Sequence, residues 1–273
     1  MSIQWYPGHM TRARRMIAEA MPRQDVVIEV LDARMPRASE NPVVGELRGA
    51  KPCVKVLSKS DLADPEVTEL WLSHFEGDGV RAIAITTARP AEARKRVGDA
   101  CGELAKLTRG RTTPRAMIVG IPNVGKSTLV NVLAERKIAK VGDEPAVTKS
   151  LQVVTMKNGI TLSDNPGIMW PKIEDPEGAL RLAFGGAIPD AALDYETVAL
   201  FGAGVVLEQY PELVRRRYKL ESLPPDAGSL LEEVGRRRGC LQRGGVVDRH
   251  KAGGILIHDF RTGQLGRISL ERP

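Results

Sequence analysis

Residues 120–127 read GIPNVGKS, and this run constrains the fold more than any other part of the chain. It matches the phosphate-binding pattern G-x-x-x-x-G-K-[ST]. An apolar, strand-like run at 116–119 precedes it, and a helical pattern follows from Thr128. Glycines let backbone N–H groups point at a phosphate, and the N-terminus of the next helix favours the negative charge. The sequence therefore predicts a strand, a phosphate-binding loop and a helix within an α/β sheet.

The side chains of this loop suit a nucleoside triphosphate with Mg²⁺. The ammonium group of Lys126 is suited to the β- and γ-phosphates, and the Ser127 hydroxyl can bind Mg²⁺. We expect the phosphates to be surrounded by Asn123, Val124, Gly125, Lys126, Ser127 and Thr128.

A second phosphate-side motif, DNPG at 164–167, follows the apolar run 160–162. A carboxylate at a strand end, here Asp164, can hold Mg²⁺ through water, and the N–H of Gly167 can contact the γ-phosphate. Thr148 lies between the two motifs and can supply a second hydroxyl to the metal. We therefore expect Ser127, Thr148 and Asp164 to be the magnesium ligands.

Two motifs upstream of the phosphate loop indicate a guanine base. Residues 58–61 read SKSD after the strand-like run 54–57 and resemble the pattern N-K-x-D. The carboxylate of Asp61 can accept two hydrogen bonds from guanine that adenine cannot donate together. Thr87 and Ala88 follow the next strand-like run and resemble a loop that backs the base. We expect Ser58, Lys59, Asp61, Thr87 and Ala88 to bind the base of GTP or GDP.

These base motifs precede the phosphate motifs, whereas an ordinary GTPase has the opposite order. Because the ends of a compact α/β domain lie close together, such a circular permutation is physically easy. The basic segment 108–115 would be the joint. The chain thus reads as a circularly permuted P-loop GTPase domain.

Apolar periodicity predicts two domains. In the first, residues 1–174, strands alternate with helices, which is typical of a mostly parallel sheet covered on both faces. The second, residues 175–273, reads as a small all-helical domain. The expected strands are 26–31, 54–57, 82–85, 116–119, 151–156 and 160–162; the expected helices are 41–48, 65–76, 90–107, 126–137, 176–186, 192–208, 210–217, 226–238 and 246–260.

Composition limits the compartment and the partners. The three cysteines are scattered, the N-terminus lacks an apolar signal-peptide core, and no apolar run is long enough to cross a membrane, so we expect a cytoplasmic chain. The net charge of +6 favours a polyanionic partner. Basic residues bunch at 215–219 and 236–243; they are either hydrated helix ends or a face that contacts phosphates.

The motif order and several further segments resemble the circularly permuted ribosome biogenesis GTPases of the YlqF/RbgA type. The segments are WYPGHM at 5–10, DARMP at 32–36, DNPGIMWP at 164–171, GCL at 239–241 and GRIS at 266–269. The resemblance covers essentially the whole chain. It implies a cytoplasmic GTPase that assists late assembly of the bacterial large ribosomal subunit, with a helical domain on ribosomal RNA. On this reading the partners include neither DNA nor a membrane, and the chain is a monomer.

Some residues depart from the family pattern or carry two interpretations. Ser58 stands where the family usually has Asn, and Ala146 where a Gly often precedes the switch threonine. Ile168 stands where many GTPases have a glutamine that orients water, so intrinsic hydrolysis should be slow. His9 is the candidate to assist hydrolysis, or else it braces the N-terminal segment. Asn123 matches the loop Asn of potassium-stimulated GTPases, which would make K⁺ a second cation.

The expected catalytic group is therefore His9, Lys126, Thr148 and Gly167. Two other functions stay open at this point. One is a nucleotide-dependent RNA-binding switch with negligible hydrolysis, which Ile168 would permit. The other is a metabolic NTPase that does not act on RNA, against which the permuted order and the basic clusters count.

Overall fold

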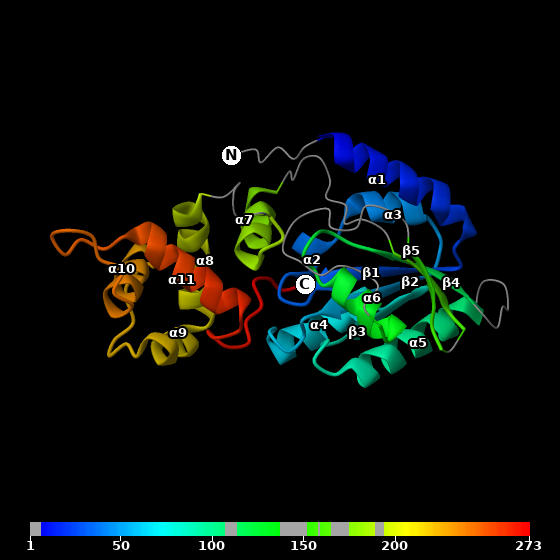
Figure 1. Ribbon diagram of the computed structural model, residues 1–273. Helices are drawn as coiled ribbons and strands as arrows, with labels where there is room; N and C mark the ends of the chain where they lie inside the picture. The colour runs from blue at the N-terminus through cyan, green and yellow to red at the C-terminus, as the bar shows by residue number, and fades with distance from the viewer. Residues whose placement is uncertain (1–6, 107–113, 137–151, 158, 165–174, 189–193) are drawn as a thin grey trace.

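A computed structural model describes residues 7–106, 114–136, 152–157, 159–164, 175–188 and 194–273 (Figure 1). Of residues 7–13, 152–154 and 164 it describes the backbone only. The sequence-predicted residues Thr148, Gly167 and Ile168 lie outside the described residues, as does Ala146.

The centre of the fold is a six-stranded sheet in the order β3-β2-β1-β4-β6-β5. Its strands are β1 (Val26–Asp32), β2 (Cys53–Ser58), β3 (Val80–Ala84), β4 (Arg115–Val119), β5 (Gln152–Thr155) and β6 (Thr161–Asp164). All pairings are parallel except β5 with β6, which is antiparallel. Every residue of β1 and β2 is buried, as expected for strands covered on both faces. The predicted, mostly parallel α/β sheet is confirmed.

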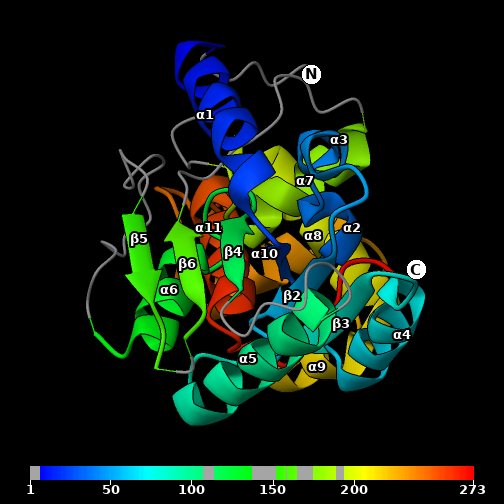
Figure 2. The same cartoon turned by 90° about the vertical axis from the view of Figure 1, so that its right-hand side faces the viewer.

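Helices cover both faces of this sheet (Figures 1 and 2). On one face, Val27 and Met117 pack in one core cluster with residues of α1 (Pro7–Ala20) and α3 (Pro42–Arg48). On the other, Ile28 and Ile118 pack with α5 (Pro90–Lys106) and α6 (Lys126–Ala134). The alternation follows from the two-residue period of a strand. The short α2 (Pro36–Ser39) follows β1, and α4 (Pro65–Phe75) lies between β2 and β3.

Helix α1 is not among the elements that the sequence patterns predicted. It begins at Pro7, a residue that suits the first helical position, and ends in the 3-10 turn η1 (Met21–Arg23). Its apolar face is sparse, because only Ile17 of the described α1 side chains is fully buried. Burial of Ile17 and Met21 against β1 and β4 attaches the helix to the sheet.

The chain after residue 175 is helical, as predicted. The helices are α7 (Pro176–Gly185), α8 (Tyr195–Gln209), α9 (Pro211–Tyr218), α10 (Ala227–Arg237) and α11 (Arg249–Arg261). Four of these helices each have their own N-cap aspartate, whose carboxylate accepts a hydrogen bond from a backbone N–H of the first turn. These helices lie beside the sheet, and the last residues return to it (Figure 1). One continuous apolar core joins β1 to α7, α8 and α11.

The three cysteines are buried free thiols. No helix in the described part of the chain is long and apolar enough to cross a membrane.

Candidate nucleotide-binding site

The phosphate motif leaves the carboxyl end of β4 and turns into α6. Gly120 has φ +149°, and a Cβ there would lie 2.5 Å from the carbonyl oxygen of Val30. Gly125 has φ +93°, and Asn123 also takes a positive φ of 59°. Only glycine fits at 120, so the backbone can curl as closely as a phosphate cradle requires.

Lys126 lies inside this loop. Its side chain is buried, and Nζ donates to the carbonyl oxygen of Ile121 at 2.5 Å, across the loop. Ser127 and Thr128 follow in the first turn of α6, where no side chain caps the helix N-terminus. The residues present therefore fit the triphosphate and Mg²⁺ predicted for this motif.

Asp164 is the last residue of β6, which pairs in parallel with β4 and places Asp164 opposite Ile118. Because the carboxyl ends of parallel strands share one edge of the sheet, Asp164 and the phosphate loop lie at the same edge. This backbone position suits the magnesium-side role that the sequence predicts.

The predicted base loop contacts the phosphate loop directly. The hydroxyl of Ser58, at the end of β2, lies 2.9 Å from the carbonyl oxygen of Leu31 and 2.5 Å from that of Val124. Lys59 Nζ donates to the carbonyl oxygen of Asn123 at 2.8 Å. Ser58 thus keeps a link to the phosphate loop although it is shorter than the usual Asn.

Asp61 and the second base loop lie next to each other. Asp61 is exposed, and within the described residues its carboxylate has no hydrogen-bond or ion-pair partner. The N–H of Ser60 donates to the carbonyl oxygen of Ile85 at 3.2 Å, which joins the two base loops. In the second loop, the Ala88 N–H donates to the Thr86 hydroxyl, and the half-buried Thr87 lies between them. The structure thus brings 58–61 and 87–88 to the edge that carries the phosphate loop.

A buried ion cluster supports these loops, and motif reasoning missed its role. Arg34 donates to both carboxylate oxygens of Asp32, from Nε at 2.9 Å and from Nη2 at 2.7 Å. Lys59 Nζ donates to the same carboxylate at 2.9 Å. Burial alone would raise the pKa of Asp32, but Arg34 and Lys59 outweigh it and hold the pKa well below its usual range. Segment 32–36 contributes only to the family resemblance in the sequence analysis. An aspartate and an arginine two residues apart, directly after a buried strand, are the sequence signal that could have predicted this ion pair.

The same cluster ties the nucleotide loops to the helical part. Arg34 Nη2 also donates to the carbonyl oxygen of Gly185, and its guanidinium lies 4.7 Å from the ring centre of Phe260. Asn123 Nδ2 donates to the carbonyl oxygen of Gly186 at 2.9 Å, beside the C-terminus of α7. The phosphate loop therefore touches the helical part through Asn123.

The remaining predicted residues are His9, Thr148 and Gly167. His9 lies in α1, and its side chain is not among those described. Thr148 and Gly167 fall outside the described residues, so their roles stay predictions.

Comparison with known proteins extends this picture. A family model described as 50S ribosome-binding GTPase matches residues 115–193. The chain is 42% identical to ribosome biogenesis GTPase A of Bacillus pumilus over 281 residues, covering 100% of this chain and 99% of the relative. It is 33% identical to ribosome biogenesis GTPase A of Thermotoga maritima, covering 99% and 95%.

A solved structure is also similar over nearly its full length. The crystal structure of GNP-bound YlqF from T. maritima matches with a TM-score of 0.69 and 29% identity. The match covers 96% of this chain and 98% of that chain. A match of this extent spans both the sheet and the helical C-terminal part of this chain.

Proposed function

Because this chain belongs to the ribosome biogenesis GTPase A family, and is thus a GTPase involved in ribosome assembly, we propose that it binds GTP between its two base loops and its phosphate loop. One observation carries this assignment. Ser58 and Lys59 of the base loop contact the carbonyl oxygens of Val124 and Asn123 in the phosphate loop. These bonds join the proposed base loop to the phosphate loop, although the two lie far apart in the sequence.

The residues have distinct roles in this proposal. Asp61 accepts the hydrogen bonds of guanine, and Thr87 and Ala88 back the base. The backbone of 123–128 surrounds the phosphates, with Lys126 as the cation. Bound Mg²⁺ neutralises phosphate charge, and Ser127, Thr148 and Asp164 would hold it, while the N–H of Gly167 contacts the γ-phosphate.

Two further roles concern hydrolysis. His9 assists the attack of water, since Ile168 cannot polarise it. K⁺ is the proposed second cation at Asn123, the loop residue whose amide nitrogen donates to the carbonyl oxygen of Gly186.

The proposed partner is the large ribosomal subunit and its RNA, bound as a cytoplasmic monomer through the helical part beginning near residue 175. Arg216 and Arg243 are exposed, whereas Arg217 is occupied by an ion pair with the buried Asp259 at 2.6 Å. Exposed arginines are the ones that phosphates can reach. Family membership favours this RNA-directed function over a metabolic NTPase and over a switch without hydrolysis.

The test of the site is Asp61→Asn. An amide presents a donor where guanine also donates, so affinity should move from GDP towards xanthosine diphosphate. Titration with fluorescent GDP and xanthosine diphosphate measures both affinities. Asp78→Asn is the matched control, because Asp78 is exposed and lies before β3, at the opposite edge of the sheet. Unchanged GDP affinity in Asp61→Asn would refute base recognition by 58–61.

A further inference from the structure

The last residues of the chain run back from the helical part onto the base loop. We call residues 267–271 the C-terminal strap. The N–H of Ile268 donates to the carbonyl oxygen of Leu62 at 2.9 Å, and the N–H of Leu270 donates to that of Arg34 at 2.7 Å. The Ile268 and Leu270 side chains are buried in the main core. The strap is therefore fixed to the α/β part by its backbone and its side chains.

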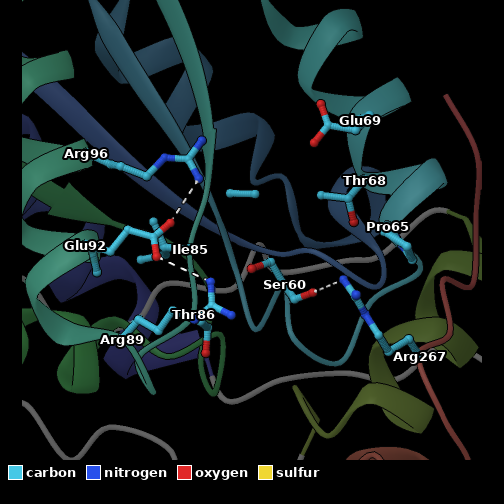
Figure 3. A pocket seen from close by; sticks show the side chains of 12 residues that line it. Ser60, Pro65, Thr68, Glu69, Ile85, Thr86, Arg89, Glu92, Arg96 and Arg267 are labelled. Carbon is cyan, nitrogen blue, oxygen red and sulfur yellow. Dashed lines mark hydrogen bonds and ion pairs between the residues drawn. The ribbon is translucent and has the colours of Figure 1, made fainter.

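Arg267 donates hydrogen bonds to the residues on both sides of Asp61 in the sequence. Its Nε donates to the carbonyl oxygen of Ala63 at 2.8 Å, and its Nη2 donates to that of Ser60 at 3.0 Å. Figure 3 shows its guanidinium reaching Ser60 at a pocket that Thr86 also lines. Because the planar guanidinium has donors in a fixed fork, it can hold both carbonyls in one geometry.

A third set of contacts joins the strap to the start of α9. The N–H of Ser269 donates to the Tyr210 hydroxyl at 3.1 Å, and that hydroxyl lies 3.2 Å from a carboxylate oxygen of Asp64. The N–H of Asp64 donates to the Ser269 hydroxyl at 3.2 Å. Tyr210 is the residue before α9, the helix that carries the exposed Arg216. Asp64, which directly follows segment 60–63 and caps α4, is thus linked to a helix that carries an exposed arginine.

We propose that the C-terminal strap, through Arg267, is a positioning element that holds Asp61 towards the guanine base and couples guanine affinity to the helical part. The strap binds segment 60–63 by three hydrogen bonds to backbone carbonyl oxygens. Arg267 donates to Ser60 and Ala63, and the N–H of Ile268 donates to Leu62. Displacement of the strap weakens nucleotide binding, and by linkage a bound guanine nucleotide favours the docked strap. The proposal rests on the assignment of Asp61 above.

The experiment compares GDP with inosine diphosphate in the full-length protein. Inosine lacks the exocyclic amino group and can donate only one hydrogen bond to Asp61. Displacement of Asp61 should therefore lower the affinity for GDP more than the affinity for inosine diphosphate. Arg267→Ala removes two hydrogen bonds, and we expect GDP affinity to fall roughly tenfold and the ratio of GDP to inosine diphosphate affinity to fall with it. Arg267→Lys, which can restore one bond, should be intermediate. Arg272→Ala is the control, because Arg272 is exposed and its side chain makes no hydrogen bond or ion pair with the described residues.

The outcomes separate this proposal from the one on which it rests. Wild-type GDP affinity in Arg267→Ala, or an equal loss for both nucleotides, would overturn the positioning role. If Asp61→Asn keeps its GDP affinity, the base assignment itself fails. If Asp61→Asn loses GDP while Arg267→Ala keeps both affinity and ratio, only the strap proposal is wrong.

Discussion

Replacing Arg34 with Met tests the buried ion cluster beneath the nucleotide loops. Both Asp32 and Arg34 have side chains only 1% exposed, so the pair is removed from water. The change deletes the two hydrogen bonds to Asp32 and the bond to Gly185, but the unbranched Met side chain still fills apolar space beside Phe260. Asp32 would then depend on Lys59 and on the backbone N–H of residue 34.

The size of the loss follows from three opposing effects. Removing one partner of a buried ion pair typically costs about 3–5 kcal/mol. Two effects reduce this cost: Lys59 remains at 2.9 Å, and Arg34 Nη1, which is buried without a hydrogen-bond partner among the described residues, leaves with the side chain. We therefore expect a loss of about 3 kcal/mol at pH 7, and a melting temperature lower by roughly 6–12 °C for a chain of this size.

The effect should depend on pH in a defined direction. The low pKa of Asp32 stabilises the fold above the carboxyl's unfolded value, about 3.9, and this contribution is lost as the pH falls through the folded value. Without Arg34, only Lys59 opposes the effect of burial, so the pKa of Asp32 is higher in the variant than in wild type. The difference between wild type and variant should be widest near pH 7 and should narrow towards pH 4.

The assay is urea unfolding of the nucleotide-free protein from pH 7 to pH 4, followed by tryptophan fluorescence. The double variant Asp32→Asn, Arg34→Met also removes the carboxylate that pairs with Lys59, so it should be no more stable than Arg34→Met. A loss below about 1 kcal/mol with no dependence on pH would refute the reasoning, because it would mean that the pair makes no net contribution.

Three other predictions concern the site and its partner. Lys126→Ala should abolish productive Mg²⁺·GTP binding, and a turnover within a few-fold of wild type would place the active site elsewhere. His9→Ala should slow ribosome-stimulated turnover while GDP affinity, measured by fluorescence titration, stays near wild type; an unchanged kcat would mean that His9 is structural. Neutralising Arg236, Arg237 and Arg238 should weaken binding to large ribosomal subunits and reduce its salt dependence in co-sedimentation, although Arg236 already pairs with Glu232 and Glu233 at 3.0 Å. An equal salt slope would remove this cluster from the RNA-binding surface.

Local features were predictable from the sequence because their causes are local. The glycines at 120 and 125 stand where the chain needs positive φ, so the phosphate loop was readable from its motif. Apolar runs predicted which segments form the strands of the sheet, because a buried strand is a short stretch of apolar neighbours.

Contacts between distant residues were decided only by the tertiary structure. Periodicity does not say that Arg34 meets Gly185, or that Arg267 reaches Ser60, because those pairs form only when the helical part docks on the sheet. Helix α1 was not predicted for the same reason. Its few buried side chains pack against β1 and β4, and this packing cannot be read from the helix's own sequence. The sequence by itself determined the strands and the nucleotide motifs, since backbone conformation and hydrophobic period are properties of neighbouring residues. The packing of the helical part on the sheet decided how the base loop is held, since burial and hydrogen bonding depend on what the fold brings together.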